Sequence, residues 1–146
     1  KHLSEDCDLV IANSDQIVDV NFQTYVSWSR STGSDGTIMV FEDDDIKWSF
    51  ARLDQAGFVS EVAEKKRISS LATVGIYYFR KGSDFVHGAN QMMQKDIRVN
   101  GEFYVCPVYN ELIQNGGKFR TWKIDKRSMH GVGTPEDLQT YLRLAR

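Results

Sequence analysis

Leu-Val-Ile-Ala-Asn-Ser-Asp, residues 9–15, is the stretch that decides the fold. Leu9 to Ala12 form a short continuous apolar run, which is typical of a strand buried on both faces of a parallel or mixed sheet. The run stops at Asn13-Ser14, so the carboxylate of Asp15 follows directly where the strand leaves the sheet. Ligands of open α/β sheets bind at the carboxyl ends of strands. We therefore expect an α/β fold with Asp15 at the ligand site.

The carboxylate of Asp15 allows two interpretations. It is a natural ligand for Mg²⁺, a hard ion that prefers oxygen donors and keeps substrate phosphates as further ligands. Asn, Ser and Asp also start turns and cap helices for purely structural reasons. Spacing alone leaves both interpretations open.

The composition predicts one globular domain. The chain has 146 residues, of which 41% are hydrophobic and 26% charged, so residues 1–146 can form a single domain with a sizeable core. The net charge of −2 gives no electrostatic reason to expect nucleic acid as a partner. No apolar run approaches a membrane span, so we expect no membrane insertion. Cys7 and Cys106 are too few for a disulfide framework, and we expect free thiols in a cytoplasmic protein.

The rest of the chain alternates apolar segments with amphipathic ones. After the opening strand, the pattern predicts further strands at residues 37–41, 48–53, 58–63, 72–79 and 119–124. Helices are expected after the N-cap Asn21, from Ser83 or Asp84 to about Lys95 with Met92 and Met93 inward, after Pro107, and from Thr134-Pro135 onward. No internal repeat or domain linker interrupts this order.

Three features combine polar or glycine residues with strand ends. Glu64-Lys65 follows a predicted hairpin and is suited to holding a sugar hydroxyl and a phosphate, or forms a surface ion pair worth little. Gly75 interrupts the strongest strand, which indicates either the close approach of a ligand or backbone, or a bulge. Asp43 and Asp45 have the Asp-x-Asp spacing with which many glycosyltransferases hold a metal, although such acidic runs are usually solvated loops.

Taken in order, five blocks of the sequence resemble the sugar-phosphate nucleotidyltransferases, in particular the subgroup associated with capsule and surface polysaccharide synthesis. The blocks are residues 9–19, 64–65, 72–79, 100–113 and 131–142. Glu-Phe-Tyr through Pro-Val-Tyr-Asn-Glu-Leu at 102–112 and Gly-Thr-Pro-Glu-Asp-Leu at 133–138 are the most specific. The ordered set spans nearly the whole chain.

The resemblance implies a Rossmann-like, glycosyltransferase-A type fold with three α/β/α layers and a mixed sheet. It also implies a reaction that joins a sugar 1-phosphate to a nucleoside triphosphate, giving a nucleotide-sugar and pyrophosphate. Because the attacking phosphate oxygen is already an anion, catalysis consists of positioning and of charge neutralisation by Mg²⁺ and lysines. A homo-oligomer is compatible with this interpretation.

Position by position, the resemblance assigns roles to five residues. Asp15 matches the metal-binding aspartate, and Glu64 and Lys65 match the pair that holds sugar and phosphate. Gly75 matches a glycine that lines the sugar pocket, and Glu102 an acidic residue that contacts sugar hydroxyls. Asp15 and Lys65 are thus the expected catalytic residues.

The sequence departs from the family in two places. Many members carry a second metal-binding aspartate just before Gly-Thr, where this chain has His130-Gly131-Val132. The glycine-rich, basic loop that cradles the triphosphate is not found in the 146 residues. We therefore expect the C-terminal part of such a domain, its N-terminal part missing, with the sugar side, one metal ligand and no turnover alone. A glycosyltransferase using Asp43 and Asp45, and a non-catalytic module that binds a sugar phosphate or nucleotide-sugar, remain alternatives.

Overall fold

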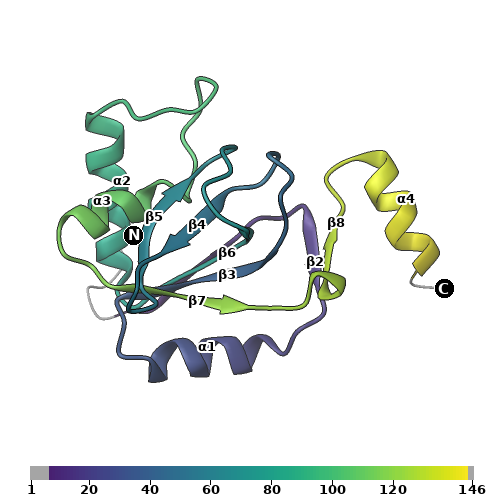
Figure 1. Ribbon diagram of the computed structural model, residues 1–146, viewed down its shortest axis with the longest axis horizontal. Helices are drawn as coiled ribbons and strands as arrows, with labels where there is room; N and C mark the ends of the chain where they lie inside the picture. Colours follow the sequence, from purple (N-terminus) through teal and green to yellow (C-terminus); the bar gives the residue numbers. More distant parts are fainter. Residues whose placement is uncertain (1–6, 145–146) are drawn as a thin grey trace.

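The computed structural model describes residues 7–144, which fold into three layers (Figure 1). The middle layer is a six-stranded sheet in the order β5-β4-β6-β3-β7, with β1 also paired to β6. Its strands are β1 (Leu9–Ala12), β3 (Gly36–Glu42), β4 (Phe50–Leu53), β5 (Val59–Ala63), β6 (Leu71–Phe79) and β7 (Phe119–Lys123). The β3–β7 pairing is parallel and the other pairings are antiparallel, so the sheet is mixed, as expected.

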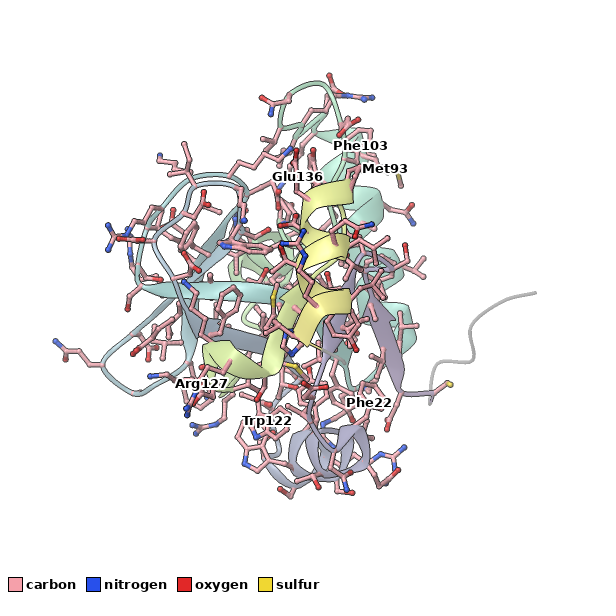
Figure 2. All side chains as sticks on the ribbon, turned by 90° about the vertical axis from the view of Figure 1, so that its right-hand side faces the viewer. Phe22, Met93, Phe103, Trp122, Arg127 and Glu136 are labelled. Atoms are coloured by element: carbon pink, nitrogen blue, oxygen red, sulfur yellow. The ribbon has the colours of Figure 1, made fainter. Side chains whose placement is uncertain are left out.

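Helices cover both faces of the sheet. Helix α1 (Phe22–Ser31) lies on one face, and α2 (Gly82–Gln94) and α3 (Val108–Gln114) lie on the other (Figure 1). Figure 2 shows the same division from the side, with the labelled Phe22 and Trp122 near α1 and Met93 and Phe103 at the opposite end. The predicted α/β/α arrangement is confirmed.

Strand β3 shows why the sequence builds two cores. Successive side chains of a strand point to opposite faces of its sheet. Ile38 and Val40 pack in the core under α2 and α3, and Met39 and Phe41 pack in the core over α1. Because all four side chains are almost fully buried, a continuous apolar run was the correct signal for this strand.

Strand β1 forms where predicted, but it is not buried on both faces. Leu9, Val10 and Ile11 are half-buried and Ala12 is exposed. The reason is its pairing: β1 contacts β6, and within residues 7–144 no second strand lies along its other edge. The expectation of a strand buried on both faces was therefore wrong.

The predicted helices form, with local differences. Asn21 caps α1, its side chain accepting a hydrogen bond from Thr24 N at 3.0 Å. Helix α2 begins at Gly82, before the predicted caps, and has no side-chain cap. Met92 is buried as expected, but Met93 is 47% exposed because it lies one position further around the helix.

Two parts of the chain that are far apart in sequence, residues 16–18 and 126–144, form an arm beside the sheet (Figure 1). Strands β2 (Gln16–Val18) and β8 (Met129–Gly131) make an antiparallel ribbon, preceded by the short 3-10 helix η1 (Lys126–Ser128). Helix α4 (Pro135–Leu144) follows, and none of its residues is buried. Thr134 caps it as predicted, accepting a hydrogen bond from Asp137 N at 3.1 Å. No helix in the described part of the chain is long and apolar enough to span a membrane.

Candidate functional site

A cavity of about 650 Å³ lies where several chain segments leave the sheet. The segments that follow β1, β3 and β5 contribute to it, together with the middle of β6 and the start of α4. Four of the five predicted site residues line this cavity: Asp15, Glu64, Lys65 and Gly75. The fold thus brings together residues that are separated by up to 60 positions in the sequence.

Glu64 is held at the end of the β4–β5 hairpin with its carboxylate half-buried. Ser49 Oγ donates a hydrogen bond to Glu64 Oε2. Burial raises the pKa of Glu64 above its usual value, while the bond from Ser49 and the charge of Lys65 lower it in part. Such an acceptor, already oriented and partly desolvated, suits the hydroxyl groups of a sugar.

Lys65 occupies a strained backbone position beside Glu64. Its φ of +51° lies in the left-handed region, which non-glycine residues seldom adopt. Its N–H donates to Trp48 O at 3.1 Å, which fixes the backbone against the start of β4. Its ammonium donates to Tyr104 Oη at 2.8 Å and lies 4.8 Å from the centre of that ring. The bond to Tyr104 is the main reason that the pKa of Lys65 is raised.

Glu102, the fifth predicted residue, does not line the cavity. Its Oε2 instead accepts a hydrogen bond from the Tyr104 hydroxyl at 2.7 Å. Glu102 is therefore linked to Lys65 through Tyr104, which lines the cavity together with the next two residues, Val105 and Cys106.

Gly75 marks both a bulge and a close approach. Between Ile38↔Tyr77 and Val40↔Thr73, β3 advances by two residues and β6 by four, so Gly75 lies in a bulge. Its φ is +83°, and a Cβ there would lie 2.5 Å from Asn13 Nδ2. Asn13 N also donates to Gly75 O at 2.9 Å. The backbone of β6 therefore opens for the segment that carries Asp15.

Asp15 lies between β1 and β2, next to the Gly-Thr segment near the other end of the chain. Its carbonyl accepts a hydrogen bond from Val132 N at 2.8 Å. A Cβ on Gly133 would lie 3.1 Å from Asp15 Oδ2, so a glycine at 133 leaves room for the carboxylate. A Cβ on Gly131 would lie 4.0 Å from Trp48 Cη2, which is an ordinary contact.

The carboxylates of the cavity do not form a ready metal cluster. Among the described residues, no group of three or more His, Cys, Asp and Glu side chains is placed to hold a metal ion. Mg²⁺ commonly takes only one or two protein carboxylates, with waters and substrate phosphates completing its shell. Asp15, with Asp137 of the first turn of α4 lining the same cavity, fits that incomplete donor set.

Asp43 and Asp45 also line the cavity, but their own chain engages them. Asp43 Oδ1 accepts from the N–H groups of Asp44 at 2.7 Å and Asp45 at 2.9 Å, and its Oδ2 pairs with Lys126 Nζ at 2.8 Å. Burial raises the pKa of Asp43, but Lys126 and the two amides outweigh it, and the net shift is downward. Asp45 Oδ1 accepts from Lys47 N at 3.0 Å. The run is an ordered loop, which matches the preferred interpretation of the sequence.

Sequence reasoning missed four residues of the site. Tyr104 belongs to the block at residues 102–112, but the resemblance gives it no role, and the pattern around Asp137 predicts only the start of a helix. Ser49 and Lys126 carried no signal, because their partners Glu64 and Asp43 are distant in sequence.

The fold resembles that of nucleotide-sugar enzymes. A nucleoside-diphosphate-sugar pyrophosphorylase from Vibrio cholerae RC9 aligns with 93% of this chain at 28% sequence identity and a TM-score of 0.77. A glucose-1-phosphate thymidylyltransferase from Bacillus anthracis, whose structure holds sucrose, aligns with 99% at 21% identity and a TM-score of 0.74. No protein-family model matches the chain, and no curated protein matches its sequence.

These structures confirm the resemblance that the sequence blocks indicated. The mixed α/β fold is that of nucleotidyltransferases, and the alignment runs over nearly the whole described chain. The chain spans 56% of the length of each of the two proteins.

Proposed function

We propose that this chain forms the sugar-phosphate side of a nucleotidyltransferase. The reaction joins a sugar 1-phosphate to a nucleoside triphosphate and releases pyrophosphate. The observation that carries the proposal is the convergence of Asp15, Glu64, Lys65 and Gly75 on one cavity. The sequence resemblance independently assigns roles at such a site to the same four residues.

The cavity suits the two halves of a sugar phosphate. Glu64 offers a hydrogen-bond acceptor to sugar hydroxyls, and its partial burial strengthens that bond because water competes less. Lys65 lies next to it and brings a compact positive charge to the phosphate. Neighbouring acceptor and cation therefore fix the direction in which the sugar phosphate lies, which is the main task of an enzyme whose nucleophile is already charged.

Asp15 is proposed to hold Mg²⁺ together with waters and substrate phosphates. When bound, the ion neutralises charge that develops on the transferred phosphoryl group. Asp15 itself is held in place by the bond from Val132 N and by the space over Gly133. We assign no residue to the nucleotide base.

Nucleoside triphosphates are made inside the cell, so we propose that the protein works in the cytoplasm. The resemblance to the subgroup associated with surface polysaccharides supports a further proposal, that the nucleotide-sugar product supplies surface polysaccharide synthesis.

One observation keeps a second function in view. Gly131 stands where many nucleotidyltransferases have a second metal-binding acid, which would suit a non-catalytic module that binds sugar phosphate. The glycosyltransferase alternative is weaker, because Asp43 is already bonded to Lys126 and to two amides.

The test uses the protein at the length at which it is made in the cell. Glucose 1-phosphate is offered with each of the four nucleoside triphosphates and Mg²⁺, and pyrophosphate release is measured. We expect release that requires both substrates and falls roughly 10- to 100-fold in kcat/KM in Lys65→Met, because a charge-assisted bond is lost. Lys118→Met is the matched control, since Lys118 is exposed, contacts Phe58 and lies outside the cavity.

Other outcomes would overturn the proposal. Release of a nucleoside diphosphate from a nucleotide-sugar, without pyrophosphate, would make the protein a glycosyltransferase. Binding of glucose 1-phosphate with no release of either product would favour the non-catalytic module.

A further inference from the structure

Three polar side chains form a chain of hydrogen bonds that ends in the cavity. Lys65 Nζ donates to Tyr104 Oη at 2.8 Å, and Tyr104 Oη donates to Glu102 Oε2 at 2.7 Å. Tyr104 and Lys65 line the cavity and Glu102 does not. The tyrosine hydroxyl thus uses its lone pair for the lysine and its proton for the carboxylate.

Lys65 needs such a partner to act at a fixed point. A lysine side chain has several rotatable bonds and is largely solvated on a protein surface, and Lys65 is an exposed residue. Its strained backbone fixes where the side chain starts but not where the ammonium ends. The hydroxyl and the ring face of Tyr104 together restrict the position of the ammonium.

The loop that carries Tyr104 is well anchored. Val99 and Glu102 exchange backbone hydrogen bonds of 3.0 Å around a tight turn at Asn100-Gly101. The guanidinium of Arg98 lies 3.9 Å from the centre of the Phe103 ring. These contacts anchor the loop at Glu102 and at Phe103, the residue before Tyr104.

The order of the three groups matters for the charge of the site. Glu102 accepts from a neutral hydroxyl, so its negative charge is not in direct contact with the ammonium. A direct ion pair would neutralise Lys65 and compete with an incoming phosphate. The intervening tyrosine orients the ammonium and leaves its other two N–H groups for a ligand.

We propose that Tyr104 is a positioning residue, which aims the ammonium of Lys65 at the phosphate of the sugar phosphate, and that Glu102 acts through Tyr104 and does not touch the sugar. This inference rests on the proposed function, and it changes the role that resemblance assigned to Glu102. It makes Tyr104 a determinant of phosphate binding and gives Glu102 a supporting part.

The test measures dissociation constants of glucose 1-phosphate and of inorganic phosphate for the full chain. Tyr104→Phe keeps the ring and removes the hydroxyl, so we expect roughly 3- to 10-fold weaker binding of both ligands. Glu102→Gln should weaken binding in the wild-type background and add nothing in the Tyr104→Phe background. Tyr141→Phe is the matched control, because Tyr141 lies outside the cavity on α4.

A second readout separates positioning from a general structural role. The Tyr104 bond is the largest cause of the raised pKa of Lys65, so Tyr104→Phe should lower that pKa in a lysine-selective NMR titration. Equal unfolding temperatures of the variants would show that the loop stays folded.

The outcomes of the two proposals are distinguishable. Wild-type protein that binds neither ligand would overturn the proposed function and, with it, this inference. Wild-type protein that binds, with Tyr104→Phe binding equally well, would overturn this inference alone. Additive losses for Tyr104→Phe and Glu102→Gln, or a loss confined to glucose 1-phosphate, would show that Glu102 or Tyr104 contacts the sugar directly.

Discussion

The cavity has two sides that are built in different ways, the proposed sugar side around Glu64 and Lys65 and the proposed metal side around Asp15. On the sugar side, Glu64 and Lys65 follow a strand of the main sheet and are bonded to Ser49 and Tyr104. On the metal side, Asp15 belongs to the arm of β2, β8 and α4, which has a three-residue ribbon and a helix without buried residues. The comparison teaches that the packed structure of this chain already orients the residues proposed to hold a sugar phosphate, whereas the proposed metal site at Asp15 needs further ligands.

The two sides meet at Gly75. The bulge of β6 admits Asn13, whose backbone N–H bonds to Gly75 O at 2.9 Å, only two residues before Asp15. A side chain at position 75 would therefore displace Asn13 and disturb both sides of the cavity.

The largest expected effect comes from the metal side. Asp15→Asn keeps the shape of the side chain and the bond from Val132 N, but removes the charge that Mg²⁺ requires. In steady-state assays we expect kcat to fall roughly 10²- to 10³-fold, with a free energy of unfolding changed by less than about 0.5 kcal/mol. Asp44→Asn, at an exposed carboxylate outside the cavity, should leave kcat unchanged. Near-wild-type turnover in Asp15→Asn would remove the metal role.

The second prediction is a gain in Mg²⁺ affinity on the proposed metal side. A Cβ at Gly131 would make only ordinary contact with Trp48, so Gly131→Asp can add a carboxylate to the incomplete donor set. Calorimetric titration should show Mg²⁺ binding tightened roughly tenfold, as expected for one added charged ligand. Gly131→Asn has the same shape without the charge and should show no gain. Equal effects of the two variants would mean that position 131 acts through shape alone.

The smallest effect concerns the stability of the sugar side. Burial raises the folded-state pKa of Glu64. The folded state therefore holds the proton of Glu64 more tightly than the unfolded state does, and protonation of Glu64 stabilises the fold. This stabilisation is complete below the unfolded pKa and is lost as the pH rises through the folded pKa. In Glu64→Gln the side chain stays neutral at every pH, so this loss of stability does not occur. The amide oxygen can still accept the hydrogen bond from Ser49 Oγ.

The measurement is the unfolding temperature of the Glu64→Gln variant at two pH values. We expect it to exceed that of the wild type by roughly 1–3 °C at pH 7, with the difference disappearing near pH 4. A variant that is less stable than the wild type at pH 7 would show that the charge of Glu64 stabilises the fold.

Much of the fold could be predicted because its signals are local. The apolar run of β3 and the caps at Asn21 and Thr134 depend on neighbouring residues, and the structure confirms them. The ribbon of β2 and β8 was not predicted, because three-residue strands carry almost no pattern and these two pair across more than a hundred residues. The exposure of β1 likewise depends on which strands lie beside it, and the sequence does not state this.

The site divides in the same way. Asp15, Glu64, Lys65 and Gly75 were identified because each lies in a block with recognisable neighbours, and all four line the cavity. Tyr104 could not be assigned from sequence, since its role follows from the ammonium of a residue 39 positions away. Roles that depend on one long-range hydrogen bond need the structure.

Binding of glucose 1-phosphate to the isotope-labelled chain, followed by amide NMR shifts, tests the central claim most directly. The account predicts shift changes centred on Glu64, Lys65 and Gly75, with smaller changes in the loop of Tyr104 and none along α1. No binding, or changes centred on the exposed face of α1, would contradict the assignment of the cavity as a sugar-phosphate site.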